Sequence, residues 1–507
     1  MRQIFLVLCF MVCSVMSAQT FEERFRAFQQ SAMDDYESFR DKANERYAEF
    51  MRQAWEYYQA APAVPEPEDD PVPPVPYEDE EQKDDDKEVI IEEVIPTPAP
   101  EPQPEPIESI KLESQPEPIE PIKPEPQPEP IDPIKPKPQP EPVANKCKFQ
   151  YFNTQCEVRI PVEINHLRAA NSDAFAEGWE NLSNGDYEAT LYDCLQLRER
   201  LKLCDWAYLL MLYEMSATSY QSANNDAMLL CAWLYCQSGY QMRMALDVDK
   251  LHLLYASRHV IYNRSYFNLD GYNYYTLLPV SNNIQICAAA FEKEQAMSLY
   301  VTEYPHLQVD KSEVRTLQSE RYSQMRVSVQ TNRNLVEFYD TYPSSELNNN
   351  PLTRWAMYAN TPLSREVQQM IYPALRQQIQ GLSTREAVER ILNFVQTAFV
   401  YEYDDKVWGG DRVFFPEETL FYPYADCEDR SILFSRIVRD LLNLPVVLID
   451  YPGHLATAVA FPEIEQGDYI SLNGKRFTIC DPTYIGAPVG ATMPRMDNQT
   501  ARAILLK

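Results

Sequence analysis

Three residues in the C-terminal part of the chain have the types needed for nucleophilic attack on an amide. Cys427 lies in the first turn of an expected helix that runs to about Leu442 and ends before Pro445. His454 opens an expected strand, and Asp481 follows the end of another. A thiolate, a general base and a carboxylate that orients the imidazole are the groups that acyl transfer through a thioester requires. We therefore take these three residues as candidate catalytic residues.

The segments between these residues predict the elements that bring them together. Residues 446–451 and 454–461 indicate two strands joined by a turn at Pro452-Gly453. Asn473-Gly474 is a strong hairpin signal, and the strand after it, 476–480, ends next to the candidate acid. A helix start, a strand start and a strand end can meet at one edge of a sheet. The expected fold class is α+β, with the helix that carries the thiol packed on an antiparallel sheet.

Two opposing effects are expected at the thiol. The positive end of the helix favours the thiolate, the form that attacks carbonyls. Glu428 and Asp429 flank the thiol and oppose its ionisation. We therefore expect His454 to dominate activation of the nucleophile.

At these residues the sequence resembles the transglutaminase-like superfamily, relatives of the papain-like cysteine enzymes. The matching pieces are Asp426-Cys427 before a helix, Gly453-His454 at the start of a strand, and Asp481-Pro482-Thr483. The resemblance is confined to residues 376–507, the expected catalytic domain. It implies a papain-like fold with Cys427 as nucleophile, His454 as base and Asp481 as orienting acid. Many relatives have an aromatic residue shortly after the histidine, where this chain has Leu455-Ala456-Thr457.

Each of these residues also has a simpler interpretation. A lone cysteine is usually a small buried hydrophobe, a histidine after glycine is often a turn residue, and Asp-Pro often marks the end of a strand. Taken together, in the right order and with the expected helix and strands between them, the three motifs favour a catalytic triad.

Trp408 is a further candidate, in the aromatic segment that leads to the nucleophile. An indole N–H can donate to an oxyanion, and aromatic side chains can line a substrate groove. Packing in the core is the alternative role for this residue.

The triad predicts attack on a glutamine or peptide carbonyl, with a thioester at Cys427 and release of an amine. If water resolves the thioester, the protein is a protease or amidase; if a lysine does, it is a cross-linking enzyme. Hydrolysis is favoured because no sequence feature marks a lysine acceptor site. The alternative from another class is a non-catalytic cell-envelope scaffold or binding protein with the same fold.

Composition excludes several function classes. The formal net charge is −31, from 45 Lys and Arg against 76 Asp and Glu, so nucleic acid is a poor partner. The five histidines form no cluster with metal-ligand spacing, and HExxH is absent. We expect no metal and no cofactor, and a protein or peptide substrate as partner.

The N-terminal residues 1–18 have the composition of a secretory signal peptide, which predicts a secreted, periplasmic or cell-envelope location. Nine cysteines follow it, an odd number for an oxidising compartment, and Cys427 is the natural free thiol. Cys147 and Cys156 bracket a short aromatic stretch and could link a hairpin. The alternative is that most cysteines are simply buried.

Two accessory segments come next. Residues 19–60 show an eleven-residue repeat of apolar positions, which predicts a long amphipathic helix. Its stripe would pack on the protein itself, or serve self-association or docking to an envelope partner. Residues 61–146 are acidic and rich in proline, which predicts a disordered polyproline II linker.

Residues 147–310 predict a second α+β unit. Expected helices at 184–215 and 223–238 precede expected strands at 242–246 and 250–255 and a hairpin turn at Asp270-Gly271. This order matches that of residues 426–483, so one interpretation is a degenerate copy of the catalytic fold. An unrelated α+β domain is the other.

The degenerate copy allows two registers. One sets Asn225 opposite Cys427 and His252 opposite His454, and the other sets Ala223 opposite Cys427. Residues 311–375 are expected to connect the two units, with strands at 325–329 and 335–339.

Overall fold

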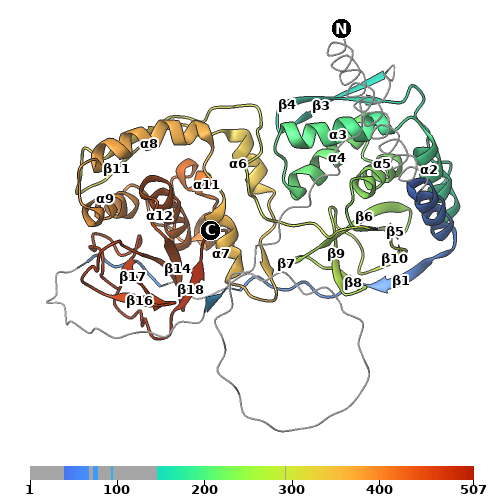
Figure 1. Cartoon of the computed structure of the whole chain (residues 1–507). Helices are drawn as coiled ribbons and strands as arrows, with labels where there is room; N and C mark the ends of the chain where they lie inside the picture. Colours follow the sequence, from blue (N-terminus) through green and yellow to red (C-terminus); the bar gives the residue numbers. More distant parts are fainter. Residues whose placement is uncertain (1–38, 68–71, 78–92, 95–144, 292) are drawn as a thin grey trace, which may run out of the picture.

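The structure is a computed structural model that describes residues 39–67, 72–77, 93–94, 145–291 and 293–507. The signal-peptide prediction at 1–18, the first half of the predicted repeat helix and most of the predicted linker lie outside the described residues. Within them the chain combines helices with antiparallel sheets, which confirms the α+β class. Figure 1 shows two lobes side by side, formed by residues 145–310 (the N-terminal lobe) and 311–507 (the C-terminal lobe).

The N-terminal lobe packs a layer of helices on one face of a six-stranded sheet (Figure 1). Its helices are α2 (Ser172–Asn184), α3 (Glu188–Arg200), α4 (Asp205–Ser219) and α5 (Asn225–Gln237). The sheet, in spatial order, is β1 (Trp55–Gln59), β10 (Asn283–Cys287), β5 (Met242–Asp247), β6 (Lys250–Ser257), β9 (Tyr272–Thr276) and β8 (Phe267–Leu269). Two further pairs are the hairpin β3 (Asn145–Tyr151) with β4 (Thr154–Ile160), and β7 (His259–Ile261) with β13 (Ser345–Leu347).

The C-terminal lobe repeats this plan. Its helices are α6 (Arg333–Asp340), α7 (Thr353–Asn360), α8 (Arg365–Ile379), α9 (Thr384–Thr397), α10 (Asp404–Val407), α11 (Pro416–Phe421) and α12 (Cys427–Leu442). Its six-stranded sheet, in spatial order, is β16 (Tyr469–Leu472), β17 (Lys475–Cys480), β15 (His454–Val459), β14 (Val446–Tyr451), β18 (Arg502–Leu505) and β2 (Glu93–Val94). A small hairpin, β11 (Arg315–Gln318) with β12 (Arg326–Val329), lies against α8.

The two large sheets have the same connectivity. In each lobe a helix (α5 or α12) leads into a hairpin (β5–β6 or β14–β15), followed by a second hairpin (β8–β9 or β16–β17) and a strand that returns beside the first (β10 or β18). Each sheet also takes its last strand from the chain before residue 95, β1 in one case and β2 in the other. The two sheets differ there, because β1 pairs antiparallel and β2 pairs parallel.

Several predicted elements need correction. The helix predicted at 184–215 is two helices, because the chain turns at Leu201–Cys204, where Lys202 has a φ of 53°. Residues 335–339, predicted as a strand, belong to helix α6, which Asn332 caps with its side chain. Leu335, Phe338 and Tyr339 lie on one buried face of this helix. A short apolar run fits a strand as well as a helix, so the sequence pattern could not distinguish the two.

The segment predicted as one helix over 19–60 changes structure near its end. Residues 39–53 are helical, but Trp55–Gln59 is strand β1. Its sequence, Trp-Glu-Tyr-Tyr-Gln, is rich in residues that favour strands, and it completes the free edge of β10. The helix buries Ala43, Tyr47 and Met51 on the N-terminal lobe, so this stripe packs on the protein itself.

The linker predicted from residue 61 is also wrong for its first part. Residues 61–67 and 72–77 lie along both lobes in extended conformation, the blue trace beneath them in Figure 1. A continuous apolar core joins the lobes, and it runs from α4 and α5 through α7 to the start of α12. Among the described cysteines none is paired, and Cys147 lies opposite Val158 rather than Cys156 in the β3–β4 hairpin.

Candidate active site

The sheet of the C-terminal lobe brings two of the three candidate residues into direct contact. His454 opens β15 and Asp481 directly follows β17, and these strands pair with Thr457 opposite Cys480. His454 Nε2 lies 2.9 Å from Asp481 Oδ2, and both side chains are buried. The other oxygen of Asp481 accepts the backbone N–H groups of Thr483 and Tyr484, at 2.8 and 3.2 Å. The carboxylate is therefore fixed from both sides, and it fixes the imidazole in turn.

The third candidate, Cys427, begins α12 as predicted, after the N-cap residue Asp426. Two contacts hold this helix in place. Ser431 Oγ donates to the carbonyl of Leu455 at 2.8 Å, which joins the helix of the thiol to the strand of the histidine. The buried guanidinium of Arg430 donates to the carbonyls of Gln396 and Phe399, both at 2.9 Å. The position of the thiol is thus set by contacts with α9 and β15.

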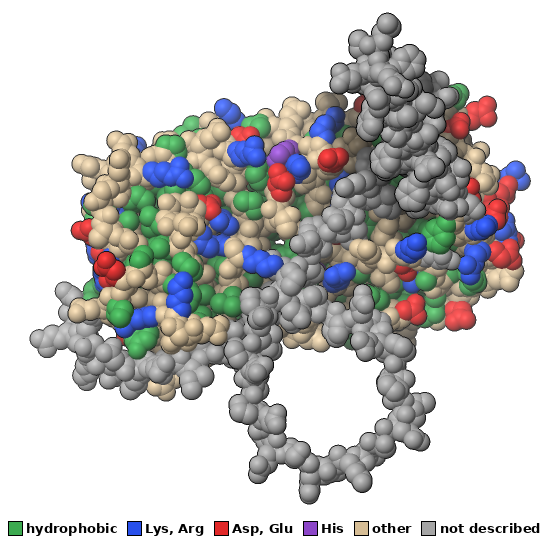
Figure 2. Space-filling model, viewed as in Figure 1, with side chains coloured by type: hydrophobic (Ala, Val, Ile, Leu, Met, Phe, Trp, Pro, Cys, Tyr) green, Lys and Arg blue, Asp and Glu red, His purple; other side chains and the backbone are tan. Residues whose placement is uncertain are grey.

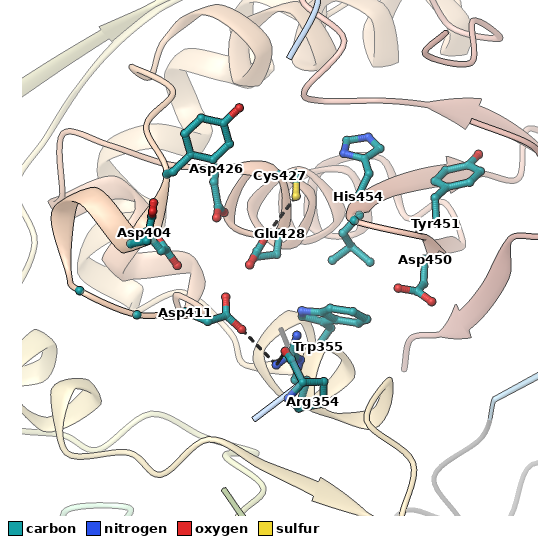
Figure 3. Close-up of a pocket in the computed structure, with 17 residues that line it drawn as sticks. Arg354, Trp355, Asp404, Asp411, Asp426, Cys427, Glu428, Asp450, Tyr451 and His454 are labelled. Atoms are coloured by element: carbon teal, nitrogen blue, oxygen red, sulfur yellow. Dashed lines mark hydrogen bonds and ion pairs between the residues drawn. The ribbon is translucent and has the colours of Figure 1, made fainter. Parts of the chain in front are cut away.

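Cys427 and His454 line the same pocket, which has a volume of about 450 Å³. Figure 3 shows the imidazole of His454 on one side of the sulfur, and Asp404, Asp411 and Glu428 on the other. His454 Nδ1 is buried and has no hydrogen-bond partner, whereas the thiol donates to Glu428 Oε2 at 2.9 Å. The structure therefore shows the base free and the thiol hydrogen-bonded to its neighbour on the helix.

The pKa of the Cys427 thiol is raised well above its ordinary value. Burial is the main cause, followed by the negative charges of Glu428 and Asp426. The backbone N–H of Leu455 hydrogen-bonds the sulfur and acts in the opposite direction. The thiol is accordingly protonated at neutral pH. Of the two acids expected to oppose its ionisation, Glu428 does so, but the second acid that contributes is Asp426 rather than Asp429.

Trp408, the candidate groove residue, does not line this pocket. Its ring packs against Phe414 and Tyr422, with centroids 5.7 and 4.8 Å apart, and Arg412 stacks on it. Trp408 is only half-buried, so it packs in a cluster of aromatic rings near the surface rather than in the core.

Trp355 of α7 lines the pocket instead, and its indole N–H is buried without a hydrogen-bond partner. Figure 3 shows the ring next to Arg354, between Asp411 and Asp450 and below Cys427 and His454 in this view. Sequence reasoning missed this residue because it lies in the region 311–375, far from the motifs, and nothing in its spacing marks it.

The side of the pocket facing away from His454 is strongly acidic. Carboxylate oxygens of Asp404, Asp411 and Glu428 all lie within 4.8 Å of one another. Burial and the charge of Glu428 raise the pKa of Asp404 to about 8 and that of Asp411 to about 7. Oxygen ligands at this separation could hold a divalent cation or a cationic group of a substrate. The prediction of no metal rested on the spacing of histidines. Such spacing cannot detect a group of carboxylates that come from α10, from the loop after it and from α12.

Arg354 and Arg412 offset part of these charges, Arg354 at Asp411 and Arg412 at Asp404. Arg354 of α7 pairs with Asp411 at 3.1 Å and with Glu66 at 3.2 Å, and its side chain is buried. The pocket wall is built from α7, α10, α12 and the β14–β15 turn. Pro67 of the N-terminal segment completes it.

The N-terminal lobe has a related arrangement with different residues at the positions of the three candidate residues. Asn225 opens α5, and the backbone N–H of Leu251 donates to its side chain at 2.9 Å, as Leu455 does to Cys427. Asn225 therefore stands where the thiol stands, and Ala223 lies before the helix.

The pairing register of the hairpin shows that the predicted match of His252 with His454 is wrong. Lys250 pairs with Asp247 at the turn of β5–β6, as His454 pairs with Tyr451 at the turn of β14–β15. Lys250 thus takes the place of His454, and His252 lies two residues further along the strand. The second β-hairpin likewise sets Leu278 in the place of Asp481.

No model of a known protein family matches this chain, and no curated protein matches it. Within the part of the chain that the structure describes, no helix has the length and apolar character needed to cross a membrane.

Proposed function

We propose that this protein is an exported, transglutaminase-like cysteine enzyme that acts on peptide or glutamine amides through a thioester at Cys427. The observation that carries the proposal is the His454–Asp481 pair, whose free ring nitrogen lies in the same pocket as a thiol at a helix start. Hydrolysis, as a protease or amidase, is favoured over cross-linking. A secreted, periplasmic or cell-envelope location is part of this proposal.

The papain-like description of the fold belongs to the same proposal. Its support is the helix α12 packed on an antiparallel sheet whose neighbouring strands carry His454 and Asp481. The matching strand order of the other lobe supports a duplication in which the N-terminal copy is not catalytic. An amide at Asn225 cannot form an acyl-enzyme.

The reaction follows from the positions of these groups. His454 Nδ1 takes the proton of the thiol, and the sulfur attacks the substrate carbonyl carbon, forming a C–S bond. Asp481 holds the opposite ring nitrogen and stabilises the imidazolium that forms. The indole N–H of Trp355 is available to donate to the oxyanion.

The tetrahedral intermediate then breaks its C–N bond, and His454 gives its proton to the leaving amine. Water, deprotonated by the same nitrogen, attacks the thioester and releases the carboxylic acid and the free thiol. Because Glu428 holds the thiol in the resting structure, the side chain of Cys427 has to rotate from Glu428 toward His454 first.

The test is the rate at which Cys427 reacts with iodoacetamide and with a peptide epoxide, followed by mass spectrometry. We expect label at Cys427 and a loss of roughly 10²-fold or more in epoxide reactivity for His454→Ala. Cys480→Ser is the matched control, because that thiol is buried on the same sheet and should not be labelled. Equal reactivity of wild type, His454→Ala and a model thiol would overturn the proposal.

A second candidate function is a non-catalytic cell-envelope scaffold or binding protein. It is favoured by the N-terminal lobe, which has the sheet and helix of the catalytic lobe but Asn225 and Lys250 in place of thiol and imidazole. Figure 2 shows basic and acidic side chains interspersed over the visible face, without the basic stripe typical of nucleic-acid binding. Both proposals therefore have a protein or peptide as the partner, and neither has a nucleic acid.

A further inference from the structure

Residues 61–67 and 72–77, here named the strap, connect the two lobes through backbone hydrogen bonds. On the N-terminal lobe, Ala61 N–H donates to the carbonyl of Tyr266, and Asn263 N–H donates to that of Val64, both at 2.8 Å. On the C-terminal lobe, Tyr77 N–H donates to the carbonyl of Ile485 at 2.9 Å. The strap is thus attached on both sides of the candidate active site.

Two strap contacts lie at the pocket itself. Pro67 is part of the pocket wall, and its carbonyl accepts from Arg354 at 3.4 Å. Val72 N–H donates at 3.0 Å to the carbonyl of Gly453, the residue before His454. Pro67 and Val72 are five residues apart, so these contacts lie at most about 18 Å from each other. The two described ends of the strap at this point, Pro67 and Val72, therefore contact the pocket wall and the turn before His454.

The strap is held in the way that an extended peptide is held on a protein edge. Backbone groups make most of its contacts, and such contacts are open to any extended chain. Its side-chain anchors are Val72, Val75 and Tyr77, which pack near Tyr484, with the two tyrosine rings 5.4 Å apart. One ion pair, Glu66 with Arg354, adds charge specificity next to the pocket.

We propose that the strap occupies the groove through which an extended polypeptide substrate reaches Cys427. The strap competes with that substrate, so the groove is open to large substrates only when the strap leaves it. This inference rests on the proposed function for its catalytic consequence. The occupancy of the groove can be tested independently of any reaction.

The first measurement is binding of a fluorescein-labelled synthetic peptide of residues 61–77 to the full-length protein, followed by anisotropy. Glu66→Ala with Tyr77→Ala weakens the strap without altering the catalytic residues. We expect about tenfold tighter binding by this double variant than by wild type, because an internal competitor lowers the fraction of competent molecules. Tyr57→Ala, on the exposed side of β1, is the matched control and should bind as wild type does. Equal affinity of wild type and double variant would overturn the proposal.

The second measurement compares two probes of Cys427 in the same proteins. The strap variant should react with a peptide epoxide about tenfold faster, while its reaction with iodoacetamide stays within twofold of wild type. Equal acceleration of both probes would show a loosened pocket and overturn the competition. If neither probe labels Cys427 in any variant, the proposed function fails, and the binding measurement still decides whether the strap occupies a peptide groove.

Discussion

Glu428 lies between the candidate nucleophile and the acidic side of the pocket. It accepts the thiol proton at 2.9 Å, and its charge contributes to the raised pKa of Cys427, Asp404 and Asp411. The same side chain therefore holds the thiol protonated and holds protons on the neighbouring carboxyl groups. At the scale of residues, the hydrogen bond from the Cys427 thiol to Glu428 must break before the thiol can react as we propose.

Replacing Glu428 with Gln should make the thiol easier to ionise. The charge next to the sulfur disappears, so the pKa of Cys427 falls, and the pH profile of iodoacetamide labelling shifts to lower pH. Asp405→Asn, at an exposed neighbouring position, is the control and should leave the profile unchanged. An unshifted profile for Glu428→Gln would show that burial alone sets this pKa.

Asp404 makes the stability of the protein depend on pH. Its pKa is about 8 in the folded chain, because of burial and the charge of Glu428, against about 4 in an unfolded one. Its protonated form favours folding, so the contribution is complete below about pH 4 and is lost as the pH rises through about 8. We expect Asp404→Asn, which can still accept from Arg412 N–H, to be more stable than wild type by about 2 kcal/mol at pH 9. Urea unfolding at pH 5 and 9 measures this, and a difference that does not grow with pH would contradict it.

At the scale of elements, the site depends on the packing of α12 against β15. Ser431 joins the two, and Arg430 ties the same helix turn to α9. These contacts connect residues far apart in the sequence. A small change in this packing would move the thiol relative to the imidazole without altering either residue.

Ser431→Ala should therefore lower reactivity as well as stability. The variant loses one buried hydrogen bond, which costs about 1 kcal/mol, and leaves the thiol helix less firmly positioned. Ser435→Ala is the matched control, because that hydroxyl is buried on the same helix and donates only to Ile432 of its own turn. We expect slower epoxide labelling for Ser431→Ala alone, measured beside urea unfolding of both variants. Equal labelling by the two would show that the contact has no positioning role.

At the scale of the whole molecule, the chain before residue 95 supplies parts to both lobes. It gives β1 to one sheet, β2 to the other, and the strap between them. The N-terminal segment is thus a structural component of the body, although its composition changes sharply at residue 61.

Limited proteolysis should cut within residues 95–144, where isolated apolar residues are separated by prolines and acids and are too sparse to form a core. Because the helix of residues 39–53 and β1 are packed on the N-terminal lobe, the fragment before the cut should remain bound. Native size-exclusion chromatography followed by mass spectrometry should find both fragments in one peak. Separation of a free N-terminal fragment under native conditions would contradict the packing of this segment.

The sequence alone was sufficient for the local elements around the candidate site. Helical spacing and the proline at 445 placed α12 from Cys427 to Leu442, and the turn residues Pro452-Gly453 and Asn473-Gly474 placed both hairpins. These signals involve only a few neighbouring residues, so they can be identified without knowledge of the fold. The same local signals predicted the order of helix and hairpins in the N-terminal lobe.

The sequence predicted that His454 and Asp481 meet, but only the tertiary structure showed which other distant residues join them at the pocket. Trp355 reaches the pocket because α7 packs on α12, and residues 55–59 become a strand because β10 offers an open edge. Neither partner can be identified from spacing along the chain. By composition, the proline-rich start of the predicted linker resembles a solvated spacer. The structure attaches it instead through backbone hydrogen bonds to Gly453 and Ile485, which any side chain allows and which composition therefore cannot reveal. Long-range packing and backbone pairing are properties of the folded chain, and they determined both the strap and the walls of the pocket.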